Sequence, residues 1–292
     1  NERGFKLILG NEIYLTRSNL TSETHQKGEH FYHLLLLAKD AKGHRQLREL
    51  STRAWGRSYY KNMMRTPTFI EDLVDIVQSE PGHLICTTAC LGGYPGTMFM
   101  MGEHSEIQPF LDNMVAIFGV DNFFVELQPS TNKDQIEFNK HMIINFWDEY
   151  NFVFTTDSHY LRKEDQEIHR LFLQSKSGSS RDVDEYYSSA YMMDWEELKS
   201  HFDWYISMPK IEVMRNNTNR IANMVEMYSI DHGQIVPRIQ YENDRFDMKK
   251  VAAIEDLFAA QGTSQFPYIQ KFLEGEHEAD RYLINLVMEG YY

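Results

Sequence analysis

The sequence predicts an α/β fold built on a mainly parallel sheet. Short apolar runs typical of strands alternate with longer runs of helical spacing from Phe5 to Lys176, which is the pattern of α/β proteins with parallel sheets. The composition is 42% hydrophobic, 25% charged and 13% aromatic. Such a balance is typical of a globular chain and argues against disorder.

Six segments carry strand signals, because they are short and apolar and most are bounded by turn residues. They are Phe5–Leu9, Glu12–Thr16, Phe31–Ala38, His83–Thr87, Phe123–Leu127 and Phe152–Thr155. We expect a turn at Gly10-Asn11 between the first two, and a polar loop at Ser18–Glu29 after the second. The continuous apolar run Phe31–Ala38 is typical of a strand buried on both faces.

Seven segments repeat apolar residues at helical spacing. They are Lys42–Trp55, Phe69–Val77, Ile107–Phe118, Asp134–Tyr150, Glu164–Lys176, Trp195–Phe202 and Lys210–Met227. A polar loop is expected at Ser177–Tyr187, and the strand signals stop there. The composition turns polar around Asp231–Asp247, and short helices are expected from there to Tyr292. We therefore expect two regions, 1–230 and 231–292, joined by a linker.

Charge and cysteine content exclude several classes of protein. The net charge is 29 − 43 = −14, so most of the surface repels the phosphates of DNA. The longest apolar run, Leu34 to Ala38, is too short for a membrane helix. The two cysteines, Cys86 and Cys90, fit no CxxC spacing, and so few thiols favour a reducing, cytoplasmic location. The chain does not begin with Met, so we expect its start to lie inside a longer protein.

Asp157 and His159 give the strongest local signal of a functional site. They directly follow the apolar run Phe152–Thr155, and residues i and i+2 of an extended segment point the same way. Functional residues of α/β barrels lie where strands end, and an Asp and a His there can ligate one metal ion or orient each other. The alternative is that Asp157 caps the next helix while His159 makes a local hydrogen bond.

Three further candidates lie at or near other strand ends. Glu12 follows the Gly10-Asn11 turn, and Cys90 precedes two glycines that permit close backbone approach. His33 lies inside an apolar strand, where an unpaired imidazole would be costly to bury. Taken singly, His33 fits a structural core histidine and Cys90 an inert buried thiol. Together with Asp157 and His159 they place one Glu, two His, one Cys and one Asp at successive strand ends.

The order of these motifs resembles the PHP domain of the DNA polymerase III α subunit. The stretches that carry the resemblance are Gly10-x-Glu12-x-Tyr14, Tyr32-His33-Leu34-Leu35-Leu36-Leu37-Ala38, Ala89-Cys90-Leu91-Gly92-Gly93 and Thr156-Asp157-Ser158-His159-Tyr160. Phe124-Val125-Glu126-Leu127-Gln128 resembles the acidic strand of the family, and 216–222 its closing helix. The tail from Asp280 is similar to the stretch that enters the polymerase palm.

The resemblance implies a fold and a set of metal ligands. The fold would be a distorted, TIM-like (β/α)7 PHP barrel lacking its first strands over 1–230, followed by a helical linker and the start of the palm over 231–292. Glu12, His33 and Cys90 match three ligands around one metal ion, and Asp157 and His159 match the final ligand pair. Mixed nitrogen, oxygen and sulfur donors suit Zn²⁺ or Mn²⁺ better than Ca²⁺.

The sequence also departs from the family pattern. The opening His-x-His and the Asp-His after the second strand are absent, and Thr156 and Ser158 replace the usual Asn and Val. The catalytic carboxylates of the polymerase would lie beyond Tyr292. The resemblance therefore implies no polymerase activity and little or no phosphoesterase activity for this chain alone.

The function implied is part of a replicative, DNA-directed DNA polymerase of bacterial or phage type. The parent protein would use primed DNA, deoxynucleoside triphosphates and Mg²⁺, and would contact a proofreading exonuclease subunit and a sliding clamp. The PHP domain would be a structural platform, with metal-dependent 3′–5′ exonuclease activity in some members. Two alternatives are a free-standing phosphoesterase acting on a small phosphate ester and a non-catalytic docking module.

Overall fold

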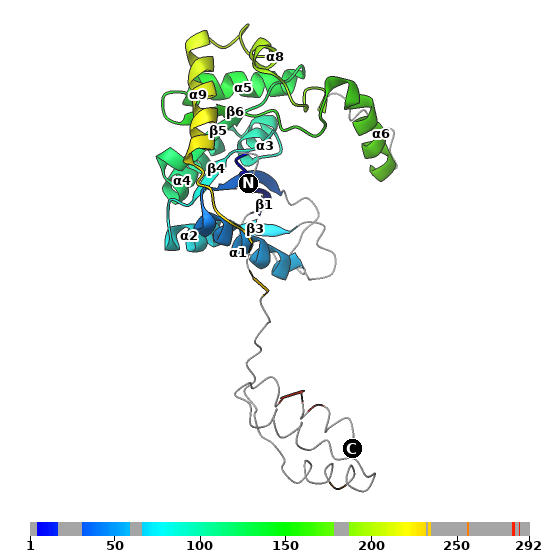
Figure 1. Cartoon of the computed structure of the whole chain (residues 1–292). Helices are drawn as coiled ribbons and strands as arrows, with labels where there is room; N and C mark the ends of the chain where they lie inside the picture. Colours follow the sequence, from blue (N-terminus) through cyan, green and yellow to red (C-terminus); the bar gives the residue numbers. More distant parts are fainter. Residues whose placement is uncertain are drawn as a thin grey trace. The chain divides into compact units, whose positions relative to one another are not determined.

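The chain divides into two compact units, Asn1–Ile230 and Asp231–Tyr292, and every element named below lies in the first (Figure 1). The computed structural model describes residues 5–16, 31–58, 66–177, 187–231 and 233–234, together with 256, 282–283 and 286. The loops expected at Ser18–Glu29 and Ser177–Tyr187, the linker and the helices after it fall almost entirely outside these residues.

Six strands form one sheet in the order β3-β1-β2-β4-β5-β6. Their bounds are β1 Gly10–Thr16, β2 Tyr32–Ala38, β3 Pro67–Phe69, β4 Leu84–Thr87, β5 Phe123–Leu127 and β6 Asn151–Phe154. β1 pairs with β3, β4 with β5 and β5 with β6 in parallel, whereas β2 is antiparallel to both β1 and β4. The expected mainly parallel sheet is therefore wrong in detail, because β2 reverses direction between its two neighbours and makes the sheet mixed.

The first strand also differs from expectation. Gly10–Thr16 is one continuous strand, and Phe5–Leu9 is not a strand. The predicted Gly10-Asn11 turn is wrong because these residues pair with Leu37 and Leu36 of β2. Glycine suits this position, since a Cβ on Gly10 would lie 2.6 Å from the Leu37 side chain.

The helices and short 3-10 turns surround the sheet. The helices are α1 Ala41–Ser58, α2 Ile70–Ser79, α3 Tyr94–Met101, α4 Ile107–Phe118, α5 Lys133–Phe146, α6 Gln166–Ser177, α8 Trp195–Ser200 and α9 Met208–Met224, and the 3-10 turns are η1 His104–Glu106, η2 Val120–Asn122 and η3 Lys163–Asp165. Each helix expected within the described residues is present, with ends shifted by a few residues. None of the described helices is both long enough and apolar enough to cross a bilayer.

One face of the sheet packs against the main core. On β5 this face carries Phe123, Val125 and Leu127, which join side chains of α1 to α5 in one buried cluster. On β2 it carries Leu34 and Leu36, whereas the alternate residues Leu35 and Leu37 are only partly buried. The expectation that β2 is buried on both faces is therefore wrong, because this strand alternates.

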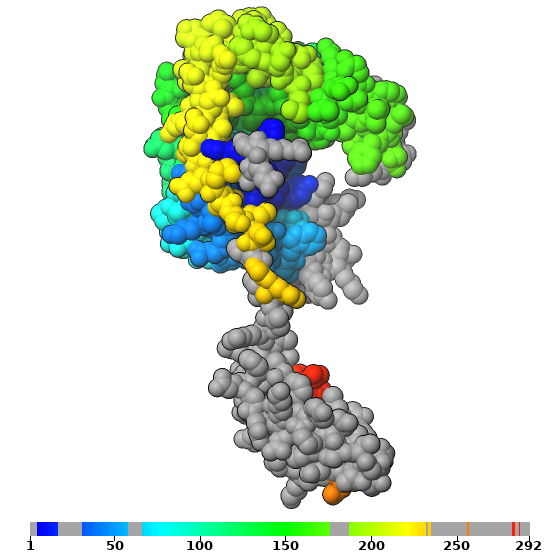
Figure 2. All heavy atoms as spheres, in the orientation of Figure 1, coloured from blue at the N-terminus to red at the C-terminus, as the bar shows by residue number. Residues whose placement is uncertain are grey.

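The other face is layered along the strand direction. Its first layer is apolar: Ile85, Phe124 and Val153 pack with Ile221 of α9 in a second, smaller cluster. α9 packs against β6 and runs, in yellow, along the surface of this unit (Figure 2).

The next layer on this face is polar. Moving two residues along each strand, the same face presents Thr87, Glu126 and Thr155. The layer beyond opens into the pocket described below.

Candidate metal centre

Glu12, His33 and Cys90 converge on one point although they are far apart in sequence. β1 and β2 are antiparallel with Glu12 opposite Leu35 and Tyr14 opposite His33, which puts Glu12 and His33 on the same face. Nδ1 of His33 lies 2.6 Å from Oε1 of Glu12 and 3.3 Å from Sγ of Cys90. One ligand atom from each of the three residues lies within 4.8 Å of the other two.

The loop after β4 brings Cys90 to this point. The backbone amide of His33 donates to the carbonyl of Gly92 at 2.9 Å, and the amide of Gly92 donates to the Cys90 sulfur at 3.4 Å. A Cβ on Gly93 would lie 2.2 Å from the Thr88 carbonyl oxygen. The loop therefore requires glycine at position 93, and it holds the thiol against the imidazole.

The electrostatics of this trio suit a divalent cation. Hydrogen bonds from the His33 ring to the Cys90 thiol and the Glu12 carboxylate raise the pKa of His33 to about 10, although burial opposes the shift. The hydrogen bond from His33 likewise lowers the pKa of Glu12. A ring proton thus lies where oxygen, nitrogen and sulfur donors meet, and metal ions displace such protons when they bind. The donor set fits Zn²⁺ or Mn²⁺.

Asp157 and His159 lie in the same pocket but apart from the trio. Asp157 follows β6 with a left-handed φ of 44°, and burial, with the charge of Glu12, raises the pKa of its carboxyl. Nδ1 of His159 lies 2.6 Å from the Asp157 backbone carbonyl, so the ring donates there and leaves Nε2 with a free lone pair. Asp157 does not cap the next helical turn, whose N-cap is Arg162.

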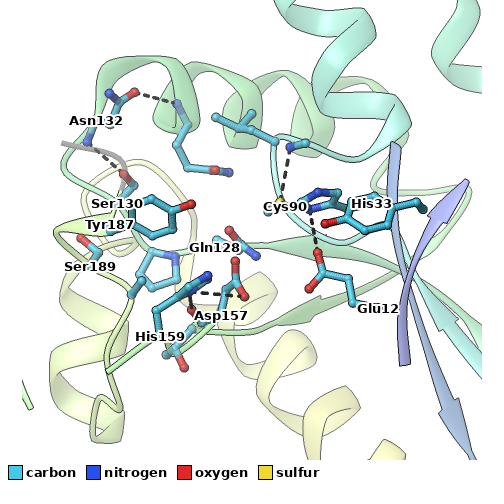
Figure 3. A pocket seen from close by; sticks show the side chains of 17 residues that line it. Glu12, His33, Cys90, Gln128, Ser130, Asn132, Asp157, His159, Tyr187 and Ser189 are labelled. Carbon is cyan, nitrogen blue, oxygen red and sulfur yellow. Dashed lines mark hydrogen bonds and ion pairs between the residues drawn. The ribbon is translucent and has the colours of Figure 1, made fainter. Parts of the chain in front are cut away.

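The pocket that unites these five residues has a volume of about 630 Å³. Figure 3 shows Glu12, His33 and Cys90 at one end and Ser130, Asn132 and Tyr187 at the other, with Gln128 and Asp157 between them. No lysine or arginine side chain of the described residues lines it. The His33 side chain is one-third exposed and Cys90 is partly exposed. His33 is therefore not a buried core histidine, and Cys90 is not an inert buried thiol.

The sequence singled out neither Gln128 nor Tyr187 as site residues, and it noted Glu126 only as part of an acidic strand. The side chain of Gln128 lies in the pocket wall, and Glu126 lies beneath it with only 3% of its surface exposed. Burial raises the pKa of Glu126. Glu126 and Gln128 are two residues apart at the end of one strand, so their side chains point the same way. This spacing is the signal that could have indicated a shared role.

Comparison with known proteins places the chain among polymerase sequences. The PHP domain family matches residues 1–130. The probable DNA polymerase YorL of Bacillus subtilis (strain 168) and the DNA-directed DNA polymerase of Bacillus phage SPbeta are each 37% identical over 98% of this chain and 22% of their own length. The DNA polymerase III subunit alpha of Treponema pallidum is 29% identical over 82% of the chain and 20% of its own length.

The chain thus spans about a fifth of the length of the curated relatives it matches. Residues 1–130 match the PHP domain family, and nearly the whole chain is similar to part of these bacterial and phage DNA polymerases.

Proposed function

We propose that this chain is part of a replicative, DNA-directed DNA polymerase III α subunit of bacterial or phage type. Homology to polymerases along 98% of the chain supports this assignment and disfavours a free-standing phosphoesterase. We assign nucleotide transfer, with primed DNA, deoxynucleoside triphosphates and Mg²⁺ as its reactants and cofactor, to other parts of the parent protein.

We assign the PHP domain a divalent metal ion, Zn²⁺ or Mn²⁺. Glu12, His33 and Cys90 would hold it, and the meeting of their donor atoms within 4.8 Å is the observation that carries the proposal. Asp157 and His159 would add ligands from the facing side of the pocket. A bound ion of this kind supplies a Lewis acid that lowers the pKa of water and polarises a phosphoryl oxygen. The free Nε2 of His159 can accept a proton or bind the ion.

The chemistry that fits this arrangement is metal-dependent phosphodiester hydrolysis, including 3′–5′ exonuclease action in the parent protein. We infer that the sheet belongs to a distorted (β/α)7 barrel. The side chains that Ile85, Phe124 and Val153 stack in a layer on one face of the sheet support this proposal. We further propose that 231–292 begins the palm region, that the parent contacts a proofreading exonuclease subunit and a sliding clamp, and that it works in the cytoplasm.

Cobalt substitution tests the proposed metal site. Titrating the chain with Co²⁺ should produce the near-ultraviolet absorption of a cobalt–thiolate bond. Cys90→Ser should abolish this absorption, whereas Cys86→Ala should retain it, because Cys86 is fully buried in the main core. Absence of the band in the unsubstituted chain, or its survival in Cys90→Ser, would contradict the proposal.

A further inference from the structure

We propose that Glu126 is a positioning residue: its buried carboxylate holds the turns after β4 and β6, and so sets where Cys90 and Asp157 lie for a divalent metal ion. The inference rests on the proposed function, because it takes these two residues as ligands of that ion. It gives a role to a residue that is not one of the proposed ligands.

The carboxylate of Glu126 joins the ends of three neighbouring strands. Its Oε2 accepts the hydroxyl of Thr87, the last residue of β4, at 2.5 Å, and its Oε1 accepts the hydroxyl of Thr155, which directly follows β6. Oε1 also accepts the side-chain amide of Gln128 at 2.9 Å. Glu126 is only 3% exposed, and a buried carboxylate is costly unless it is hydrogen-bonded. Since Phe124 fills the same face one layer below, an apolar side chain would suffice if this position only packed.

Each of the two strand ends that Glu126 holds leads into a left-handed residue. Ala89, two residues after Thr87, has a φ of 58°, and Asp157, two residues after Thr155, has a φ of 44°. They are the two non-glycine residues with positive φ in the described part of the chain. This conformation is uncommon outside glycine and persists where the surrounding structure fixes it. Both turns therefore need a constraint, and Glu126 supplies one to each.

On the β4 side, hydrogen bonds lead from Glu126 to the residue before the proposed sulfur ligand. The Thr87 hydroxyl that donates to Glu126 also accepts the backbone amide of Ala89 at 3.4 Å. The backbone amide of Glu126 donates to the hydroxyl of Thr88 at 2.9 Å. Cys90 directly follows Ala89, so these contacts fix the point from which its side chain enters the pocket.

On the β6 side, Thr155 is held at both its main chain and its side chain. Its backbone amide donates to the carbonyl of Leu127 at 3.2 Å, and its hydroxyl donates to Glu126. Asp157 follows two residues later and lies in the pocket wall. Because one carboxylate holds both turns, it sets the position of Asp157 relative to Cys90. Ligands held in place beforehand bind a metal ion more tightly than ligands that must be ordered on binding.

Cobalt binding measures this role without relying on activity. Isothermal titration of the chain with Co²⁺ gives the affinity. We expect Glu126→Gln, Thr87→Val and Thr155→Val each to weaken binding by about 10- to 100-fold, the usual cost of losing a group that orients a ligand. The matched control is Thr218→Val, because the Thr218 hydroxyl donates to the Met214 carbonyl at 3.2 Å on α9, outside the pocket. It should leave the affinity unchanged.

A double-mutant cycle separates positioning from general structural damage. Oε1 of Glu126 accepts two donors and Oε2 accepts one. In Glu126→Gln the remaining oxygen should therefore keep the Thr155 side, and the new NH₂ group should face Thr87. Thr87→Val should then add little to Glu126→Gln, whereas Thr155→Val should add its full effect.

The outcomes distinguish this inference from the proposed function. If the unsubstituted chain binds no Co²⁺, the metal centre is wrong and the positioning role falls with it. If it binds Co²⁺ with an affinity that Glu126→Gln and both threonine variants leave unchanged, the positioning role alone is wrong. Equal weakening by Thr218→Val, or a full added effect of Thr87→Val in the Glu126→Gln background, would also overturn it. The threonine variants keep the carboxylate, so they decide the question even if Glu126→Gln does not fold.

Discussion

At the scale of single residues, the candidate site depends on one ring nitrogen. Nδ1 of His33 lies within hydrogen-bonding reach of both the Glu12 carboxylate and the Cys90 sulfur, and no other described residue joins these two groups. The sequence identified all three residues through motif order. It could not give their distances, which depend on the β1–β2 register and on the path of the loop after β4.

His33→Ala should therefore remove more than one interaction. We expect Zn²⁺ affinity to fall by more than about 100-fold, since losing a ligand should cost more than the 10- to 100-fold lost with an orienting residue. Zinc content per chain after dialysis, measured by atomic emission, checks this. His44→Ala is the control, because His44 lies on α1 and packs against Tyr228 outside the pocket. Unchanged zinc content in His33→Ala would leave His33 without a ligand role.

A second histidine should make stability depend on pH. His141 of α5 packs against His104 with ring centroids 4.6 Å apart, and among the described residues its buried Nε2 has no hydrogen-bond partner. Burial, together with the charge of His104, lowers the pKa of His141 below 6.5. The unfolded chain then binds this proton more readily, so the stability from the neutral ring is complete above pH 6.5 and declines as the pH falls below that value.

Replacing the ring tests this pH dependence. The melting temperature of the native chain should fall more steeply between pH 6.5 and pH 5 than that of His141→Phe, which keeps an aromatic ring beside Phe99 and Phe146. Melting curves recorded at half-unit steps of pH would show the difference. Parallel pH profiles for the two proteins would contradict it.

At the scale of elements, α9 closes the apolar layer beneath the polar one. Ile221 is 8% exposed and packs with Ile85, Phe124 and Val153. We expect Ile221→Ala to lower the free energy of unfolding by about 2–4 kcal/mol, the range for removing a buried Ile side chain. Chemical denaturation measures it, and Val213→Ala on the exposed side of the same helix should change stability by less than about 0.5 kcal/mol.

The elements also show what the sequence could and could not predict. The sequence predicts a strand at Phe123–Leu127, and β5 has these bounds. A short apolar run between turn signals leaves few choices for where a strand begins and ends. β3 and α3 were not predicted, since the first has three residues and the second contains Pro95 and Gly96 near its start. Gly96 fits there through contact with Leu91, whose carbonyl oxygen would lie 2.5 Å from an added Cβ. Such contacts join residues through the folded structure, so they cannot be predicted from a local sequence pattern.

At the scale of the whole molecule, charge limits what the chain can do alone. A net charge of −14 repels the phosphate backbone, and no lysine or arginine of the described residues lines the pocket. We expect duplex DNA to bind weakly at physiological salt, with a dissociation constant no tighter than the non-specific range of about 10⁻⁴–10⁻⁶ M. Fluorescence anisotropy with a labelled duplex checks this, and nanomolar binding would reveal a basic surface.

The chain alone should also extend no primer. Two-metal nucleotide transfer needs clustered carboxylates. Among the described residues the one group of three or more candidate ligands is Glu12, His33 and Cys90, which has a single carboxylate. A primer-extension gel should show no product above background with Mg²⁺ or Mn²⁺, and templated extension by the purified chain would refute the expectation.

The alternation of β2 has a consequence for how the chain finds its fold. Four consecutive leucines, Leu34–Leu37, occupy both faces of this strand, so a shift by one residue would still place leucine toward both layers. The register of a strand is normally set by which of its side chains are hydrophobic and buried. In β2 the hydrophobic pattern alone leaves two registers possible. A one-residue slip would turn the imidazole of His33 into the main core away from Glu12 and Cys90, at the cost of an unpaired buried polar group. The same histidine that the site requires thus supplies the positional information that the leucines lack.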